Sequence, residues 1–437
     1  MIGRFALALS ALAFVAGAPA SAMNIERIVS PSGIEAWLVR EQTVPLVSLN
    51  YAFHGGTSQD EPGKSGTANL ASTLLDEGAG DFDAKAFHEK LEGRAIELGF
   101  RVGRDYFYGS LRTLNENRDE AFDLLRLSLT APRFDAEAVE RMRSQQISTL
   151  RRAAVTPDEI ASRNWWATAF PGHPYGLEGT GTMDSVAKAT VADIRDYIGR
   201  VFARNELKIS IVGDIDPEAA GKLIDRAFAA LPPRNNLRPV PEATAGGLGR
   251  RIVIPVDVPQ AVVTFGGPGI ERSDPDFMAA YLVNHILGGG TFSSRLYREV
   301  REKRGLAYGV SDSLVWFKSA SVVLGGTATR ADRTGDALSI IQSETKRMAA
   351  EGPTAEELAG AKAYVKNSYA LGLDTSVRIA AQLTQIQLDK LGIDYIDRRG
   401  SLIDAVTIDD AKRVAKRLYG GGMLVTVAGK PTGVTSE

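Results

Sequence analysis

Few side chains in this sequence could bind a metal ion. The chain has four histidines (His54, His88, His173 and His285) and no cysteine, so it has no thiolate and any metal site would combine histidines with carboxylates. Two histidines four residues apart on a helix would face one zinc ion, but no histidine has such a neighbour. His88 has Glu92 at that spacing. Because the surrounding segment is rich in charge, a solvated helix face is the simpler interpretation of this pair.

A run of three glycines, Gly288, Gly289 and Gly290, is the second feature with a possible chemical role. A phosphate-binding P-loop ends in Gly-Lys followed by Ser or Thr, and a dinucleotide-binding turn has the spacing G-x-G-x-x-G with an acidic residue downstream. The run meets neither pattern, since Thr291 and Phe292 follow it. It therefore indicates the end of a helix and a flexible connection.

The composition is that of a globular protein and excludes several classes of function. Of the 437 residues, 44% are apolar and 7% aromatic, which argues against disorder and collagen-like repeats. The 51 Lys and Arg residues nearly balance the 53 Asp and Glu residues, so the chain lacks the positive charge typical of proteins that bind nucleic acids or anionic membranes. The length is enough for roughly two to four domains.

Residues 1–22 are typical of a secretory signal peptide. Arg4 provides a positive charge, residues 5–16 are apolar, and residues 20–22, Ala-Ser-Ala, offer a cleavage site. The apolar stretch is well short of the roughly 20 residues that span a bilayer, and no cysteine follows it for lipid attachment. The sequence predicts a mature chain that begins near Met23, has no membrane span, and is periplasmic or secreted.

The mature chain reads as one unit of about 200 residues used twice. Phe53 and Phe265 each end an apolar alternation and are 212 residues apart, as are Leu75 and Leu287, which each end a helical pattern. Later correspondences have a slightly larger separation: the helix starts at 134–137 and 353–356, the helix caps at 190 and 407, and the strand patterns at 207–213 and 423–429. This ordered series predicts an internal duplication.

Patterns of period two alternate with patterns of period 3.6 within each half. They predict an α+β fold in which the helices of each half pack on a mixed or antiparallel sheet, with further strands at 251–256 and 321–327. A segment rich in Pro and Gly separates the halves. We therefore predict an N-terminal half over 23–231, a linker over 232–250 and a C-terminal half over 251–437. We expect the halves to face each other as a clamshell, although periodicity alone does not establish this.

Three stretches of the chain resemble the pitrilysin/insulinase metallopeptidase family, in the family's order. The first is Phe-His-Gly-Gly-Thr at 53–57 with Pro-Gly-Lys-Ser-Gly-Thr-Ala-Asn at 62–69, and the second is Phe-Pro-Gly-His-Pro-Tyr-Gly at 170–176. The third and most specific is Leu-Gly-Gly-Gly-Thr-Phe-Ser-Ser-Arg-Leu at 287–296 with Arg-Glu-Lys-Arg-Gly-Leu-Ala-Tyr at 301–308. The resemblance covers nearly all of the mature chain.

The zinc motif that this resemblance implies is missing. Active members carry H-x-x-E-H on a helix, where the two histidines bind zinc and the glutamate activates the metal-bound water. The equivalent positions here are Asn69, Ser72 and Thr73. None has an imidazole or a carboxylate, while Leu70 and Leu74 keep an apolar helix face. We therefore expect a retained scaffold with a degenerate metal site and no cofactor in this chain.

The other half of the implied site is present. The family contributes an arginine and a tyrosine, seven residues apart, from its second half, and they match Arg301 and Tyr308. We expect Arg301 in the last turn of a helical segment over 293–304, which Gly305 ends, and Tyr308 at the start of a strand over 307–315. In a peptidase these donors would stabilise the oxyanion at a scissile carbonyl, by about 3 kcal/mol each. Without the resemblance, a surface arginine and a half-buried tyrosine would be the simpler interpretation.

The resemblance also implies a role for the glycine run, since the family uses this stretch to contact substrate or the opposite half. Gly288, Gly289 and Gly290 are therefore candidate substrate-binding residues.

An incomplete site suggests a divided enzyme. The family includes heterodimers in which one subunit has the zinc motif and the other the Arg/Tyr pair, as in mitochondrial processing peptidase and some bacterial pairs. The first hypothesis is a zinc-free periplasmic subunit that binds unfolded peptide and is not catalytic alone, with zinc on an H-x-x-E-H partner. The alternatives are a non-catalytic peptide-binding or structural homodimer of the same fold and, third, a self-sufficient hydrolase with an unrecognised mechanism.

Overall fold

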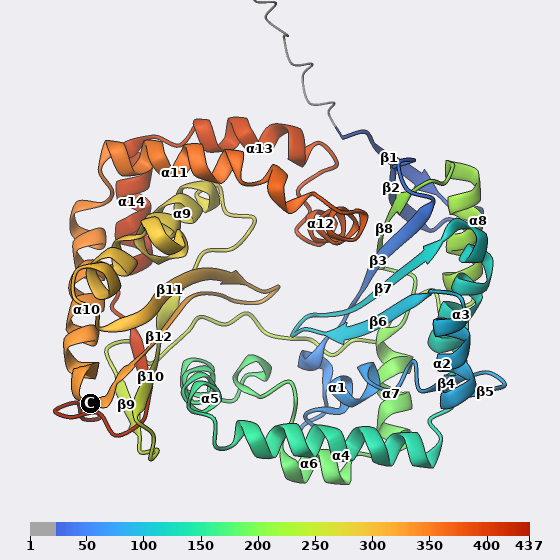
Figure 1. Cartoon of the computed structure of the whole chain (residues 1–437), viewed down its shortest axis with the longest axis horizontal. Coiled ribbons are helices and arrows are strands. Elements are labelled where there is room, and N and C mark those ends of the chain that lie inside the picture. Colours follow the sequence, from blue (N-terminus) through green and yellow to red (C-terminus); the bar gives the residue numbers. More distant parts are fainter. Residues whose placement is uncertain (1–22) are drawn as a thin grey trace, which may run out of the picture.

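The computed structural model describes residues 23–437, so the predicted signal peptide at 1–22 lies outside the described residues. Two halves, each a sheet with helices packed on it, face each other across the centre of the molecule (Figure 1). The predicted α+β fold is confirmed. Among the described residues, no helix is long and apolar enough to cross a membrane.

The first half is built on a six-stranded sheet with the order β1-β2-β8-β3-β7-β6. Neighbouring strands are antiparallel except for the parallel pair β2 and β8. The strands are β1 (Ile25–Val29), β2 (Glu35–Arg40), β3 (Leu46–His54), β6 (Glu97–Val102), β7 (Tyr106–Leu114) and β8 (Lys208–Gly213); β4 (Gly78–Ala79) and β5 (Phe82–Asp83) form a separate small hairpin.

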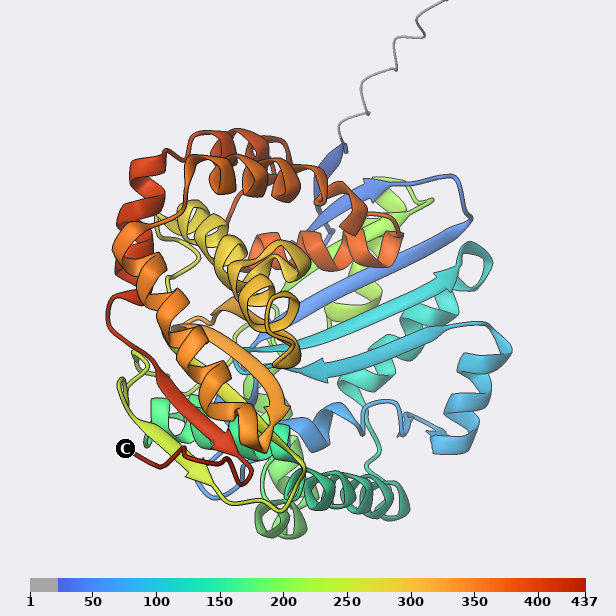
Figure 2. The ribbon, with the colours of Figure 1, turned by 60° about the vertical axis from the view of Figure 1, so that its left-hand side comes forward.

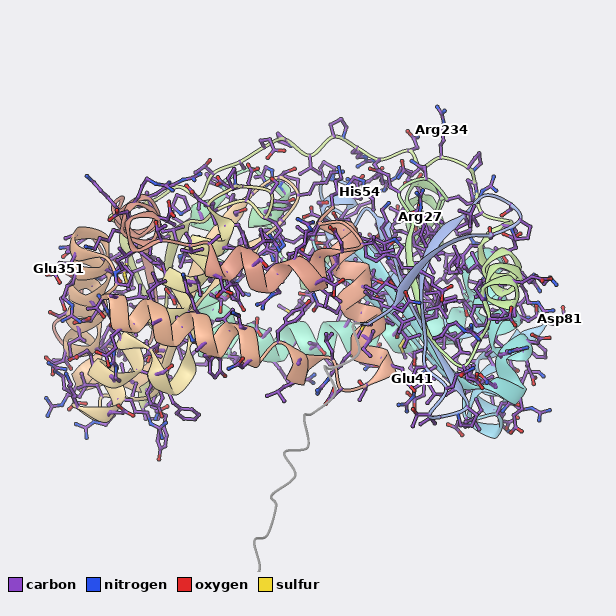
Figure 3. The ribbon with its side chains drawn as sticks, turned by 90° about the horizontal axis from the view of Figure 1, so that it is seen from above. Arg27, Glu41, His54, Asp81, Arg234 and Glu351 are labelled. Carbon is purple, nitrogen blue, oxygen red and sulfur yellow. The ribbon has the colours of Figure 1, made fainter. Side chains whose placement is uncertain are left out.

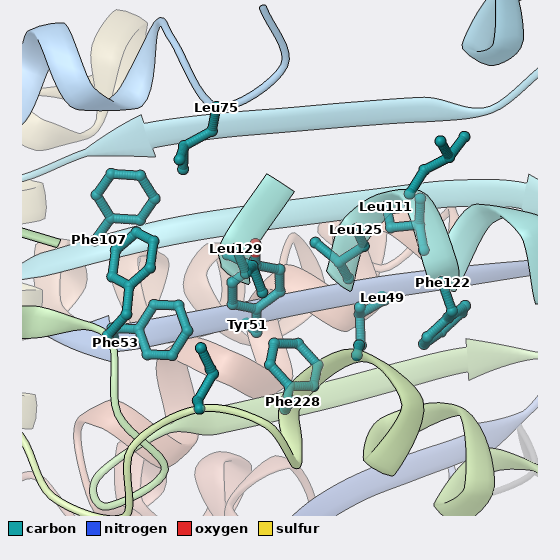
Figure 4. Packing of buried hydrophobic residues seen from close by; sticks show 14 of the residues in the cluster. Leu49, Tyr51, Phe53, Leu75, Phe107, Leu111, Phe122, Leu125, Leu129 and Phe228 are labelled. Carbon is teal, nitrogen blue, oxygen red and sulfur yellow. The ribbon is translucent and has the colours of Figure 1, made fainter. Parts of the chain in front are cut away.

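Helices cover one face of this sheet and enclose the largest apolar core. Aliphatic side chains make up most of the core, and a group of aromatic rings lies among them, with Tyr51 edge-on to Phe228 (Figure 4). Phe53 is stacked on Phe202. The helices of this half are α1 (Thr67–Ser72), α2 (Ala84–Gly93), α3 (Arg118–Thr130), α4 (Ala136–Ala153), α5 (Pro157–Ala169), α6 (Met183–Lys188), α7 (Val191–Val201) and α8 (Pro217–Phe228), with short 3-10 turns at Thr57–Gln59, Asn115–Asn117 and Pro174–Gly176.

The second half repeats this plan with a five-stranded sheet, order β11-β12-β10-β13-β9. Its strands are β9 (Arg251–Ile254), β10 (Gln260–Pro268), β11 (Ala307–Trp316), β12 (Ser321–Arg330) and β13 (Leu424–Ala428). Its helices are α9 (Phe277–Asn284), α10 (Thr334–Glu351), α11 (Ala355–Asn367), α12 (Ser376–Leu388), α13 (Tyr395–Asp404) and α14 (Ile408–Tyr419), with π-helices at His285–Gly289 and Tyr297–Glu302 and 3-10 turns at Thr291–Ser293, Ala331–Arg333 and Ala370–Gly372.

The sheet orders support the predicted duplication. The order β2-β8-β3-β7-β6 corresponds strand by strand to β9-β13-β10-β12-β11, and the single parallel pair is equivalent in both halves. The register corrects one detail. Ala52 pairs with Lys208 and Gly266 pairs with Leu424, so β3 and β10 are equivalent at a separation of 214 residues, not 212. Phe265 therefore corresponds to Tyr51, two residues before Phe53.

The two halves exchange one helix each. Helix α12 of the second half lies on the first sheet (Figures 1 and 2). Its buried face packs against Trp37, Val39 and Val212. Helix α5 of the first half lies in the same way on β10 and β13 of the second sheet. On the first sheet, Leu38 and Ile211 alternate with the residues that α12 covers, so their side chains point to the opposite face, into the core under the first half's own helices. Each sheet is therefore covered on one face by its own helices and on part of the other by a helix from the opposite half.

Buried polar contacts fix both exchanged helices. On α12, the Gln387 side-chain amide donates to the Ile209 carbonyl at 2.9 Å and to the Ser210 hydroxyl at 2.8 Å. On α5, the indole N–H of Trp165 donates to the Leu424 carbonyl at 3.2 Å. The Thr426 hydroxyl donates to the Ala161 carbonyl at 2.8 Å.

Residues 232–250 contain no helix or strand and run along the contact between the halves. The Ala243 amide donates to the Ser319 carbonyl and the Gly246 amide to the Ala169 carbonyl, while Ala245 is buried among aromatic residues. The segment is therefore anchored to both halves at its C-terminal part, although most of its residues are exposed. The boundaries proposed for the halves and linker stay predictions.

Candidate functional site

Two positions of the degenerate zinc motif, Asn69 and Ser72, lie on the short helix α1, and Thr73 is its C-cap residue. The predicted helical pattern runs to Leu75, but α1 ends at Ser72, so the helix is shorter at its C-terminal end than the sequence predicts. The Ser72 hydroxyl donates to the Asn69 carbonyl at 2.7 Å and the Thr73 hydroxyl to the Leu70 carbonyl at 3.0 Å. Such bonds occupy carbonyls that would otherwise continue the helix. Ser72 is buried, Asn69 half-buried and Thr73 exposed.

Asn69 lines a cavity of about 310 Å³ in the first half. Its polar wall includes Glu159 and the ion pair between Arg163 and Glu178, whose N–O distance is 3.1 Å. Within residues 23–437, no three His, Cys, Asp or Glu side chains lie close enough together to hold a metal ion. The cavity offers hydrogen-bonding groups, and no metal-holding group of side chains, beside Asn69 in the described part of the chain.

The Phe-Pro-Gly-His-Pro-Tyr-Gly stretch joins the two halves. The Tyr175 hydroxyl donates to Asp105 Oδ1 at 2.5 Å and accepts from the Ser319 amide at 3.2 Å. Asp105 Oδ2 accepts from the Lys318 amide at 2.8 Å. Burial, with the neighbouring Asp105 carboxylate, raises the pKa of Tyr175 well above its usual range, so the phenol stays protonated and can donate. This network ties the turn between β6 and β7 to the turn between β11 and β12.

Two further contacts extend this connection. The Arg104 guanidinium lies 3.9 Å from the ring centre of Trp166, and burial lowers its pKa to about 10. His54 lies between the two ends of the molecule, which Glu351 and Asp81 mark in Figure 3. Its Nδ1 is 2.8 Å from Glu206, and its Nε2 is 2.9 Å from the Lys318 ammonium of the other half. Although burial opposes it, the hydrogen bond from His54 lowers the pKa of Glu206.

A larger cavity of about 640 Å³ lies between the halves. The first half contributes the end of β3, parts of β6 and β7, the turn between them and the start of β8. The second half contributes the end of β11, the end of α12 and residues 271–273. Aromatic rings and charged side chains line it together, which suits a ligand with both apolar and charged groups.

The glycine run packs tightly against β11. A Cβ atom on Gly288 would lie 2.4 Å from Asp312 Oδ1 and 2.8 Å from the Asp312 backbone nitrogen, so only glycine fits there. Gly288 is buried and Gly289 exposed, at the end of the π-helix His285–Gly289. The run therefore ends the helix as expected, and only its later part faces outward. Its contact with substrate stays a prediction.

Asp312 gives the protein a testable pH dependence. Burial raises the pKa of this carboxyl to about 7, although the Tyr419 hydroxyl donates to it at 3.1 Å. The folded state thus holds a proton that the unfolded chain loses above about pH 4, and stability falls as the pH rises toward 7. Between about pH 5 and 8 we expect the wild type to lose about 2–3 kcal/mol more unfolding free energy than Asp312→Asn in urea titrations.

Exposed Asp81 provides the matched control for this experiment, because Asp81→Asn should follow the wild type across the same range. Parallel curves for the wild type and Asp312→Asn would contradict the prediction.

Arg301 and Tyr308 lie where the sequence places them, on consecutive elements of the second half. Arg301 is in the π-helix Tyr297–Glu302, with its guanidinium 4.9 Å from the ring centre of Tyr297, and Gly305 follows the helix with a φ of 60°. Tyr308 is second in β11, an edge strand, and its side chain is 89% exposed. Neither residue lines the two cavities described above. Within this chain they are thus not brought together with Asn69, and their catalytic role stays a prediction.

The sequence did not reveal the residues that connect the halves. The stretch around Tyr175 was noticed only as part of a resemblance, and its partners Asp105 and Lys318 lie in turns without a motif. Alternation along β7, which places Tyr106 and Tyr108 on the face opposite Phe107, was the one available signal for the cavity wall.

Comparison with family models matches the chain in two consecutive parts. Residues 37–182 match the model described as Insulinase (Peptidase family M16), and residues 188–365 match the model described as Peptidase M16 inactive domain.

Similar proteins are found among curated sequences and among solved structures. The chain is 27% identical to a Helicobacter pylori protein named non-peptidase homolog YmxG, over 82% of this chain and 83% of that protein. It is 26% identical to an uncharacterized zinc protease of Streptomyces coelicolor, over 93% and 90%. The structure of a peptidase M16 inactive domain from Pseudomonas fluorescens aligns with a TM-score of 0.87 at 27% identity, covering 95% of this chain and all of that one. A Helicobacter pylori protease, 18% identical, shares the fold with a TM-score of 0.84 and covers 93% of this chain and all of its own.

Proposed function

Because the chain belongs to the insulinase (peptidase M16) family as an inactive-type member, we propose that it is the zinc-free subunit of a heterodimeric metallopeptidase. The observation that carries the proposal is that α1 is retained without its zinc-binding residues. The helix packs in the family fold and borders an open cavity, yet Asn69, Ser72 and Thr73 supply no zinc ligand and no general base. A family member of this kind can act in proteolysis only with groups from another chain.

In this proposal the partner supplies the H-x-x-E-H motif and its zinc, and this chain supplies Arg301 and Tyr308. Two features support the assignment. Among the described residues, neither the Arg301 guanidinium nor the Tyr308 hydroxyl has a hydrogen-bond partner, so both remain free to bind a substrate carbonyl. Tyr308 also lies on an edge strand, where another chain can approach.

We further propose that the complex works in the periplasm on unfolded peptides. The layout of residues 1–22 supports export, and the cavity between the halves has a volume in the range of small-ligand sites, which suits a short segment of a peptide. N-terminal sequencing of the mature protein should begin near Met23. An N-terminus at Met1 would contradict export with cleavage.

Reconstitution tests the proposal. The purified mature chain and an exported relative with an intact H-x-x-E-H from the same cell are assayed separately and together on a fluorogenic unfolded peptide. We expect cleavage only by the mixture, and we expect a chelator to abolish it because zinc is essential. Zinc analysis of each subunit should find the metal in the partner alone.

Three outcomes would overturn the proposal. Robust cleavage by this chain alone, or one tightly bound zinc per isolated chain, would show a self-sufficient enzyme. A stable homodimer in native extracts without a zinc-bearing companion would favour a non-catalytic peptide-binding or structural protein.

A further inference from the structure

The cavity between the halves carries more free positive than negative charge. Six Lys and Arg side chains line it, and three of them are engaged. Lys318 contacts His54 and Glu206, Arg272 contacts Asp389 and Tyr395, and Arg104 donates to the Tyr175 carbonyl. The others are Arg101, Lys208 and Lys390. Within the part of the chain that the structure describes, none of these three has a carboxylate oxygen within 4.0 Å.

The acidic side chains of the same cavity are mostly occupied. Asp105 accepts from the Tyr175 hydroxyl and the Lys318 amide, and Glu206 is bound to His54. Asp389 accepts from the Trp316 indole at 3.1 Å and the Gln385 amide at 3.0 Å. Of the four lining acids, Asp105 and Glu271 have no Lys, Arg or His side-chain partner within 4.0 Å among the described residues. Three cations without a carboxylate partner thus face two carboxylates without a basic partner. Six cations face four carboxylates in all, so the cavity has a net positive potential.

Aromatic rings lie beside the free cations. Arg101 pairs across the strands with Tyr108, and its guanidinium lies 3.7 Å from the centre of that ring. Tyr106 is on the same face of β7, two residues away, and its ring is 6.0 Å from that of Tyr108. Trp316 at the end of β11 contributes a ring from the other half. The wall can therefore contact apolar side chains while its cations bind carboxylates.

We propose that this cavity binds an extended acidic peptide segment that carries aromatic or large apolar side chains. The inference rests on the proposed peptide-binding function and specifies its substrate class. The carboxylates pair with Arg101, Lys208 and Lys390, which have no competing acids, and the apolar side chains lie against Tyr106, Tyr108 and Trp316. A basic peptide would meet like charges and is excluded.

Fluorescence anisotropy on the isolated full mature chain tests this. The probe is a fluorescein-labelled ten-residue peptide of alternating Glu and Tyr, compared with a peptide in which Lys replaces each Glu. We expect the Glu peptide to bind at least about tenfold tighter at low salt, with the difference shrinking as salt is added. The double variant Arg101→Glu/Lys208→Glu should lose at least about tenfold in affinity, whereas Arg101→Lys/Lys208→Arg should retain it.

The matched control is Lys346→Glu, an exposed cation on α10 outside the cavity, which should leave binding unchanged. Equal affinity for the two peptides, an equal loss in Lys346→Glu, or complete competition by free glutamate at equal carboxylate concentration would overturn the inference. The experiment needs no partner and leaves Arg301 and Tyr308 intact. If it fails while reconstituted cleavage succeeds, the charge preference is wrong and the divided enzyme stands.

Discussion

In a reconstituted complex, Arg301→Ala and Tyr308→Phe should each lower kcat by about 10²–10³-fold while the complex still assembles. Each substitution removes a donor that would be aimed at the oxyanion of the scissile carbonyl, and such a donor acts more strongly in the transition state than in the ground state. Tyr308 is 89% exposed, and the Arg301 guanidinium lies over the Tyr297 ring without a salt bridge among the described residues, so neither change should unfold the subunit. Steady-state kinetics with assembly checked by gel filtration provides the measurement.

Two neighbouring side chains offer matched controls for this pair. Arg298 lies in the same π-helix and Tyr364 is 60% exposed on α11, and neither belongs to the proposed site. Arg298→Ala and Tyr364→Phe should leave kcat within about twofold of the wild type. Unchanged rates in Arg301→Ala and Tyr308→Phe would remove both residues from the mechanism.

The largest loss of stability is expected from Trp165→Ala. This side chain is completely buried, packs edge-on against Trp166, and donates its indole N–H to the Leu424 carbonyl of the opposite half. Truncation would leave a large cavity between α5 and the second sheet and remove a buried hydrogen bond between the halves. We expect the free energy of unfolding to fall by about 3–5 kcal/mol in denaturant titrations.

Val155 provides the comparison for this variant, because it lies just before α5 and is 71% exposed. Val155→Ala should change the unfolding free energy by less than about 0.5 kcal/mol. A similar small effect for Trp165→Ala would mean that the α5 contact contributes little to stability.

Local sequence signals predicted the fold well wherever a side chain acts within its own element. Thr190 and Thr407 were predicted as helix caps, and both form capping boxes, with Asp193 and Asp410 respectively. The separation of β3 and β10 was wrong by two residues. A shift of two keeps every side chain on the same face of the sheet, so alternation cannot detect it; only the pairing with β8 and β13 can.

The site could be predicted only in part, for a related reason. Absent zinc ligands and the positions of Arg301 and Tyr308 are properties of short motifs, so they were visible in the chain. The network of Tyr175, Asp105 and Lys318 joins three distant segments. Nothing in the local pattern of any one segment specifies the other two, and their meeting depends on how the halves pack.

The reciprocal placement of α5 and α12 makes the two halves interlocked parts of one body. Each sheet would lose an apolar cover if the opposite half were withdrawn, so a wide swing about the 232–250 segment would strip both covers at once. If one peptide bond in that segment were cleaved, the two fragments would stay associated through these helix contacts. A wide opening of the two halves would therefore have to break both helix contacts and also the network of Tyr175, Asp105 and Lys318 that ties the two hairpin turns together.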